Sequence, residues 1–289
     1  MFKSHCNAHP QRLDLFEMGE LLERSRSENE AIIRAKCQTS YLGAHVALCR
    51  VLGRFKMFVD TNDIDLSTHL MLDGYWEMWV TEAMCRLVRP GMVVADIGAN
   101  LGYFALLMAE LVGPDGFVHA FEPNPHIARQ LRQSLDINSF SGRHAVHQVA
   151  LAAIDGEPMA FVVPPTQPKN ARLAPFSGEL PENATLLHTR RLDSDTAWHK
   201  IEFAKIDVEG AEELLWAGAQ GLLDGSRLKT VVLEFTPIRY SDPAAFLDKL
   251  LAPGFSLSWI DPWNGIRPIT GDELWSRNSV EDVMLVLQR

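Results

Sequence analysis

The sequence predicts an α/β protein built on a doubly wound, mostly parallel sheet, and three observations support this prediction. From residue 93 onward, short apolar runs typical of buried strands alternate with segments that have the apolar period of helices. A tight turn with the sequence Gly-Ala-Asn-Leu-Gly, residues 98–102, joins the first of these strands to the helix after it. The chain has 289 residues, 47% of them hydrophobic, so it can bury a large core without disulfides. We therefore expect helices on both faces of one sheet.

The N-terminal part of the chain does not follow this alternation. Residues 1–74 are expected to form a helix and a β-hairpin that precede an α/β domain of residues 75–289. Apolar residues recur among charged ones over 12–40, which predicts the helix. Two apolar runs joined by Gly-Arg indicate the hairpin, over 45–60. Packing of the helix on its own chain is the preferred interpretation, and a homodimer contact through it is the alternative.

The α/β part divides into strands and helices in chain order. Apolar runs predict strands over Val93–Ile97, Phe117–Phe121, 146–151, 159–163, 201–207, Thr230–Phe235, 255–260 and 282–287. Helical periodicity predicts helices at 101–112, after Asn124-Pro125, at 210–223 and at 243–251. A segment rich in proline and polar residues, 164–190, interrupts the alternation, and we interpret it as a loop. This loop is either a lid that closes over a substrate or a passive insertion.

Two acids bracket the glycine turn. Asp96 lies just before Gly98, and Glu122 ends the next strand. An acid at that second position can accept hydrogen bonds from ribose hydroxyls, as in dinucleotide-binding sheets. The glycine spacing is G-x-x-x-G rather than the G-x-G-x-x-G of pyrophosphate sites, and the Asp96 carboxylate suits a cationic ammonium group better than a phosphate. The pattern therefore favours S-adenosylmethionine over NAD as the ligand; a plain tight turn with a solvated acid is the alternative.

Charged residues also end two later strands. Lys205, Asp207 and Glu209 alternate in the sequence, so an extended strand would place them on one face. Glu234 ends the following strand and is expected at the same edge of the sheet. Charges on a central strand are unfavourable unless they are paired or used. With Asp207, Glu234 could flank a substrate hydroxyl or hold a divalent cation, and a buried ion pair that sets the strand register is the alternative.

Several short stretches in this order carry a likeness to a known family. They are residues 74–77, 96–104, 121–125, 149–151, 192–193 and 205–212, together with Glu234 on the following strand. Over about 60–289 the chain resembles the FkbM-type S-adenosylmethionine-dependent methyltransferases. The resemblance implies a class I methyltransferase (Rossmann-like) sheet of seven strands with the last one antiparallel. It also implies S-adenosylmethionine as methyl donor and O-methylation of a hydroxyl on a sugar or natural product.

The resemblance assigns cofactor-binding roles position by position. Asp96, Gly98 and Asn100 would surround the methionine part of the cofactor. Glu122 would bind the ribose, with Asn124 nearby. Glu77 would approach from the preceding segment. The other cofactor-binding residues implied by the matching stretches are Ala99, Gly102 and Ala150.

Transfer of a methyl group to an alcohol needs a base or a metal ion, because an alcohol is a weak nucleophile. We expect Asp207, with Glu209 and Glu234, to orient the hydroxyl and help remove its proton. A bound Mg²⁺ would serve the same purpose, but the sequence assigns no metal ligands. Five histidines are alternative bases: His69, His119, His144, His147 and His188.

Charge and cysteine content limit the other classes. The net charge of −10 disfavours nucleic acid as a partner, so a small-molecule acceptor is expected. No run of apolar residues is long enough for a membrane span, and the first residues lack the apolar core of a signal peptide. Four widely spaced cysteines argue against a zinc site and fit a reducing, cytoplasmic location. Two other functions stay open, an NAD-dependent oxidoreductase and a non-catalytic cofactor-binding subunit.

Overall fold

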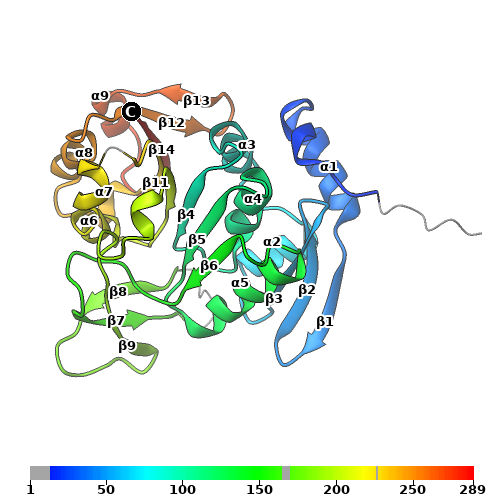
Figure 1. The fold of residues 1–289 in the computed structure, drawn as a ribbon, viewed down its shortest axis with the longest axis horizontal. Coiled ribbons are helices and arrows are strands. Elements are labelled where there is room, and N and C mark those ends of the chain that lie inside the picture. The colour runs from blue at the N-terminus through cyan, green and yellow to red at the C-terminus, as the bar shows by residue number, and fades with distance from the viewer. Residues whose placement is uncertain (1–13, 165–169, 226) are drawn as a thin grey trace, which may run out of the picture.

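The computed structural model describes residues 14–164, 170–225 and 227–289, and its centre is a twisted eight-stranded sheet (Figure 1). The strands lie in the order β13-β12-β14-β11-β10-β4-β5-β6. Their bounds are β4 Val93–Ile97, β5 Phe117–Phe121, β6 His144–His147, β10 Phe203–Ile206, β11 Thr230–Phe235, β12 Ser256–Asp261, β13 Gly265–Pro268 and β14 Val283–Gln288. The five strands from β6 to β11 are parallel, and β14 is antiparallel to both of its neighbours. This is the seven-stranded class I methyltransferase sheet that the resemblance implies, with β13 added at one edge.

Helices cover both faces of the sheet, as the alternation predicts (Figure 1). One face packs against α3 Met78–Leu87, α4 Tyr103–Leu111 and α5 Pro125–Ile137. The other packs against α6 Glu212–Ala217, α7 Gln220–Asp224, α8 Pro243–Leu251 and α9 Gly271–Trp275. Successive strand residues alternate between the two cores: Val94 and Phe203 belong to the first, and Ala95 and Ala204 to the second. The doubly wound fold is therefore confirmed.

The predicted N-terminal helix over 12–40 is wrong in its extent, and its first two residues lie outside the described part of the chain. The structure has a 3₁₀ turn, η1 Met18–Leu22, and a shorter helix, α1 Arg26–Lys36. Ser25 begins α1 with a capping box to Glu28, which is why the helix does not run through this point. Arg26 forms an ion pair of 2.7 Å with Glu82 of α3, so α1 packs on its own chain.

The predicted hairpin is present and belongs to a three-stranded sheet. Strands β2 Val46–Val51 and β3 Phe55–Asp60 pair antiparallel, as expected, and β1 Thr39–Gly43 adds to β2. Helix α2 Leu66–Leu72 follows. Side chains of β2, β3 and α2 share one apolar core with α3, α4 and α5, so the N-terminal segment lies against the same face of the central sheet as those helices.

Three expectations in the second half are wrong in part. The predicted loop 164–190 contains two strands, β8 Arg172–Pro175 and β9 Ala184–His188, which flank β7 Pro158–Val162 in an antiparallel sheet; residues 165–169 lie outside the described part. The strand predicted at 146–151 ends at His147. The helix predicted at 210–223 is divided into α6 and α7 near Gly218, where a Cβ atom would lie 2.1 Å from the Ala152 carbonyl oxygen, so another part of the backbone passes too close for any larger residue.

No helix in the described part of the chain combines the length and the apolar character that crossing a bilayer requires.

Candidate functional site

The turn between β4 and α4 has a left-handed backbone at three positions, which favours glycine and asparagine there. Gly98 and Gly102 have φ angles of +77° and +95°, and Asn100 has +48°. A Cβ atom on Gly98 would lie 1.7 Å from the carbonyl oxygen of Asp207. The same atom on Gly102 would lie 2.1 Å from Cδ1 of Leu131. The first glycine therefore lets the turn approach the end of β10, and the second lets α4 begin against α5.

Glu122 holds this turn to the end of β5. Its carboxylate accepts hydrogen bonds from the backbone N–H of Asn100 at 3.0 Å and of Asn124 at 2.7 Å. Asn124 in turn caps α5, as its sequence predicts. Burial raises the pKa of Glu122 to about 7, and the two backbone hydrogen bonds act in the opposite direction. Each carboxylate oxygen has a further lone pair, so Glu122 can also accept hydrogen bonds from a ligand.

A first cavity lies between the ends of β4 and β5 and the small sheet β7–β9. Its lining is mostly apolar with one buried carboxylate, and includes Phe121, Glu122, Asn124, Val149, Ala150, Leu151, Phe161, Leu173 and Val208. Phe161 and Leu173 come from β7 and β8, in the part of the chain predicted to be a loop and candidate lid. Of the predicted cofactor residues, Gly98, Asn100, Glu122, Asn124 and Ala150 line this cavity.

A second cavity lies on the other side of the glycine turn. Its lining includes Leu66, Trp76, Glu77, Ala99, Gly102, Lys205, Glu234, Arg239 and Asp282. Four residues line both cavities, namely Gly98, Asn100, Asp207 and Glu209. The two cavities therefore meet where the glycine turn approaches the end of β10. Asp96 is buried, with 1% of its surface exposed, and is not among the described residues that line either cavity.

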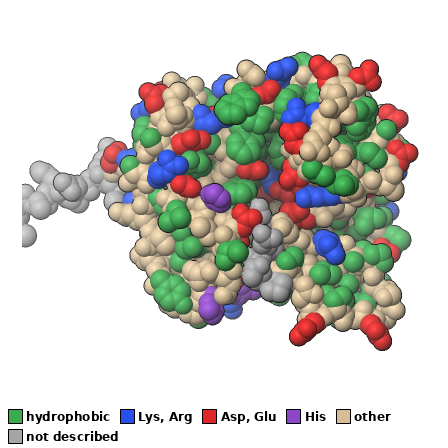
Figure 2. Space-filling model, turned by 180° about the vertical axis from the view of Figure 1, so that it is seen from behind, with side chains coloured by type: hydrophobic (Ala, Val, Ile, Leu, Met, Phe, Trp, Pro, Cys, Tyr) green, Lys and Arg blue, Asp and Glu red, His purple; other side chains and the backbone are tan. Residues whose placement is uncertain are grey.

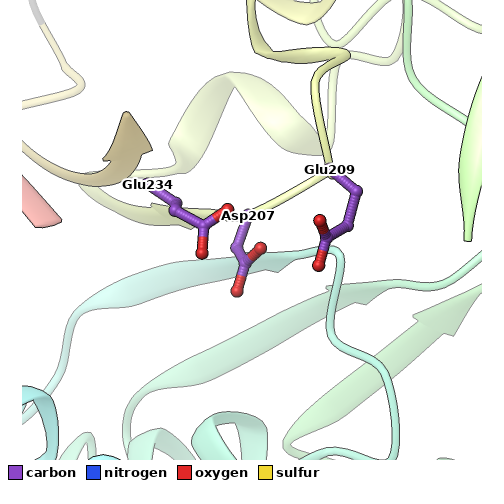
Figure 3. A group of neighbouring side chains, drawn as sticks. All are labelled: Asp207, Glu209 and Glu234. Carbon is purple, nitrogen blue, oxygen red and sulfur yellow. The ribbon is translucent and has the colours of Figure 1, made fainter. Parts of the chain in front are cut away.

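The three predicted catalytic carboxylates come together at this edge of the sheet (Figure 3). One carboxylate oxygen from each of Asp207, Glu209 and Glu234 lies within 4.8 Å of the others. Asp207 directly follows β10, and Glu234 belongs to β11. The strand ends at Ile206, and Glu209 has a φ of +54°, so a turn brings Glu209 to the cluster rather than the strand alternation that the sequence suggested.

Two basic side chains bind this cluster. Lys205 Nζ lies 2.9 Å from Oδ2 of Asp207, and its ammonium also lies over the ring of Phe104. Arg239 binds Glu209 at 2.8 Å and Glu234 at 2.5 Å. The ion pair of Lys205, which the sequence left open as an alternative, is therefore present. Arg239 was missed, because it comes from the 3₁₀ turn η4 Pro237–Arg239, where no sequence motif marks it.

Burial and mutual repulsion change the acidity of the cluster. Burial raises the pKa of Glu209 to about 7, with a further contribution from Asp207, while Arg239 acts in the opposite direction. The pKa of Glu234 is raised for the same reasons, burial first and then the charges of Asp207 and Glu209. Burial also raises the pKa of Asp96 to about 6. At neutral pH these groups hold protons more tightly than ordinary surface carboxyls.

The cluster does not by itself assign a metal ion. Three carboxylates at this spacing are a donor set that Mg²⁺ accepts. Lys205 and Arg239, however, already bind an oxygen of each carboxylate. The suggestion of Mg²⁺ therefore stays a prediction from the sequence, and we assign it no ligands.

The candidate histidine bases lie elsewhere. His119 Nδ1 and His147 Nε2 are 3.0 Å apart on neighbouring strands β5 and β6, and burial lowers the pKa of both rings to about 4. His144 pairs with Asp136 and His69 with Asp73. His188 belongs to β9. Within 14–164, 170–225 and 227–289, none of the five histidines lines either cavity.

Comparison with known proteins identifies methyltransferases as similar to this chain. A family model described as Methyltransferase FkbM domain matches residues 96–257. The 31-O-demethyl-FK506 methyltransferase FkbM of Streptomyces tacrolimicus is 46% identical over 56 residues, 19% of this chain and 21% of that protein. A protein-L-isoaspartate O-methyltransferase of Methanothrix thermoacetophila is 44% identical over 55 residues, 18% of this chain and 26% of that protein. The chain thus spans about a quarter or less of the length of these relatives.

Among solved structures, the methyltransferase FkbM of Methylobacillus flagellatus aligns with 76% of this chain and 52% of its own, at 15% identity and a TM-score of 0.43.

Proposed function

Because the chain belongs to the methyltransferase FkbM domain family, we propose that it transfers the methyl group of S-adenosylmethionine to a hydroxyl of a small sugar or natural product. One observation carries this proposal: the two cavities meet at Gly98, Asn100, Asp207 and Glu209. A donor in one cavity and an acceptor in the other would have their reacting atoms at that junction. Holding reactants in line in this way can supply roughly 7–11 kcal/mol of the acceleration of a displacement reaction.

The first cavity has the features that the nucleoside part of the donor needs. Glu122 is a buried acceptor for ribose hydroxyls, and the apolar walls around Phe121 and Val149 suit a flat adenine ring. Gly98 leaves no side chain on a turn that another backbone already approaches. Both carboxylate oxygens of Asp96 lack a hydrogen-bond partner among the described residues, so a cation bound at the adjacent turn would be stabilised. The residues therefore fit S-adenosylmethionine.

The second cavity has the features that an alcohol acceptor needs. When bound, S-adenosylmethionine supplies an electrophilic methyl group on a sulfonium centre. Lys205 holds one oxygen of Asp207, so the other oxygen is available to orient the acceptor hydroxyl. We assign the hydroxyl proton to Glu234, because a carboxylate with a raised pKa is better matched to an alcohol than an ordinary one. Glu209 is held by Arg239 and contributes charge to the same space.

The N-terminal segment contributes to this cavity through Leu66. We therefore propose that the N-terminal extension predicted for residues 1–74 contributes to the acceptor site through Leu66 of α2, beside the methyltransferase domain of residues 75–289. A homodimer contact through α1, by contrast, has no support beyond the sequence pattern.

A thermal-shift experiment separates the proposed donor from NAD. S-adenosylhomocysteine is expected to raise the melting temperature of the protein by several degrees, since it binds only the folded state, and NADH is expected to leave it unchanged. Stabilisation by NADH alone would instead favour the oxidoreductase. If the nucleoside binds but no sugar or natural-product alcohol in a broad panel accepts a methyl group, the non-catalytic subunit becomes the better reading.

A further inference from the structure

The walls of the second cavity carry an excess of negative charge. Among the described residues that line it, five are acidic and two are basic. The acidic ones are Glu77, Asp207, Glu209, Glu234 and Asp282, and the basic ones are Lys205 and Arg239. Two of these acids, Asp207 and Glu209, line both cavities and so lie at the junction, where Lys205 and Arg239 pair with them; the other three acids line the second cavity. Figure 2 shows acidic and basic side chains gathered near the middle of one face of the molecule.

A second observation lies behind the junction. Asp96 is 1% exposed, and neither of its carboxylate oxygens has a hydrogen-bond partner among the described residues. Its backbone pairs in register with Lys205, whose ammonium binds Asp207 and also acts to lower the pKa of Asp96, although burial is the larger effect and raises that pKa overall. A buried carboxylate without a partner is strongly destabilised, and a nearby positive charge relieves this. Asp96 and the acidic residues of the cavity walls therefore both stabilise a positive charge at the junction.

The donor and its product differ in charge at the reacting atom. S-adenosylmethionine carries a sulfonium, and S-adenosylhomocysteine carries a neutral thioether in the same place. We propose that the acidic junction makes this site select its nucleoside by charge, so that it binds the donor about tenfold more tightly than the product. The enzyme would then be little inhibited by its own product. This inference rests on the proposed function, because it needs the nucleoside to bind with its sulfur at the junction.

The same geometry predicts proton release on donor binding. Glu209 is faced by Asp207 before it in the chain, Glu212 of α6, Glu234 of β11, Arg239 of η4 and Asp282 before β14. A cation at the junction favours the ionised form of Glu209 and therefore lowers its pKa from the value of about 7. The affinity for the donor should then rise with pH through about 7, where Glu209 of the free protein becomes ionised, and the raised pKa of Glu234 extends this rise to higher pH. Glu122 acts on the ribose of both ligands, so the ratio of donor affinity to product affinity is the quantity that should rise with pH.

Calorimetry on the full chain tests the proposal without an acceptor. The probes are S-adenosylmethionine, S-adenosylhomocysteine and sinefungin, an analogue with an amine at the position of the methyl-bearing sulfonium. The two cationic ligands are expected to bind about tenfold more tightly than the thioether, and Glu209→Gln to reduce this ratio to about threefold. Binding of the thioether to the same variant reports that the site is still folded.

The matched control is Glu213→Gln, the same change on α6. Glu213 pairs with Lys249 and is not among the described residues that line either cavity, so its ratio should equal that of the wild type. Equal or tighter binding of the thioether by the wild-type protein overturns the proposal, and so does a Glu209→Gln variant that weakens all three ligands equally. If none of the three ligands binds, the proposed function itself fails, which is a different result.

Discussion

An alanine in place of Gly98 is expected to abolish binding of S-adenosylmethionine and to lower the free energy of unfolding by about 3 kcal/mol. The added Cβ would lie 1.7 Å from the carbonyl oxygen of Asp207, and the backbone φ of +77° disfavours any L side chain. The turn would have to move away from the end of β10, which separates the residues that line both cavities. Urea denaturation measures the stability, and calorimetry with S-adenosylhomocysteine measures the binding.

Gly91→Ala is the matched control for this change. Gly91 has a similar φ of +82°, but a Cβ there would meet no atom of the described residues within 4 Å. This variant should lose only the cost of the left-handed backbone, roughly 1 kcal/mol, and should bind the nucleoside as the wild type does. A Gly98→Ala protein with wild-type affinity would show that the close approach of the turn to β10 does not shape the site.

The substitution Glu234→Gln is expected to reduce kcat for methyl transfer by about 100-fold or more, the usual range for loss of a general base. Glutamine keeps the shape and can still accept a hydrogen bond from Arg239, so the fold and the affinity for S-adenosylhomocysteine should change little. The measurement is initial-rate kinetics with an alcohol that the wild-type protein methylates. Glu213→Gln serves again as the control outside the cavities.

The pH profile separates a base from a merely structural carboxylate. Glu234 must be ionised to take a proton, and burial, with the charges of Asp207 and Glu209, raises its pKa. The kcat of the wild type should therefore rise with pH, and this rise should occur at a higher pH than the titration of an ordinary carboxyl would produce. In Glu234→Gln this rise of kcat with pH should disappear. An unchanged rise of kcat with pH in the variant would show that another group accepts the hydroxyl proton.

Much of the cofactor side of the site follows from local sequence. Glu122 reaches the turn from the end of the next strand, 22 residues along the chain from Asn100. The turn at residues 98–102 needs glycine for backbone reasons, and Asn124 caps the helix that begins at the next residue. Effects of this range leave a pattern in consecutive residues. The order of the buried strands is readable for the same reason, since each strand is a continuous apolar run.

The acceptor side is less predictable, because it is assembled from distant segments. Arg239 reaches Glu209 and Glu234 from a 3₁₀ turn, and Leu66 enters the cavity from the N-terminal segment. Neither feature corresponds to a residue spacing that the sequence would reveal. Two of the missed strands have a local explanation: β1 is exposed along most of its length and β8 has only four residues, so neither shows an apolar alternation.

A crystal structure of the protein with S-adenosylhomocysteine tests the central claim most directly. We expect the ribose hydroxyls within hydrogen-bonding distance of the Glu122 carboxylate and the adenine among the apolar residues of the first cavity. The sulfur should lie at the junction beside Gly98 and Asp207, facing the cluster that contains Glu234. A nucleoside bound outside the first cavity, or one whose sulfur points away from the second, would contradict the account.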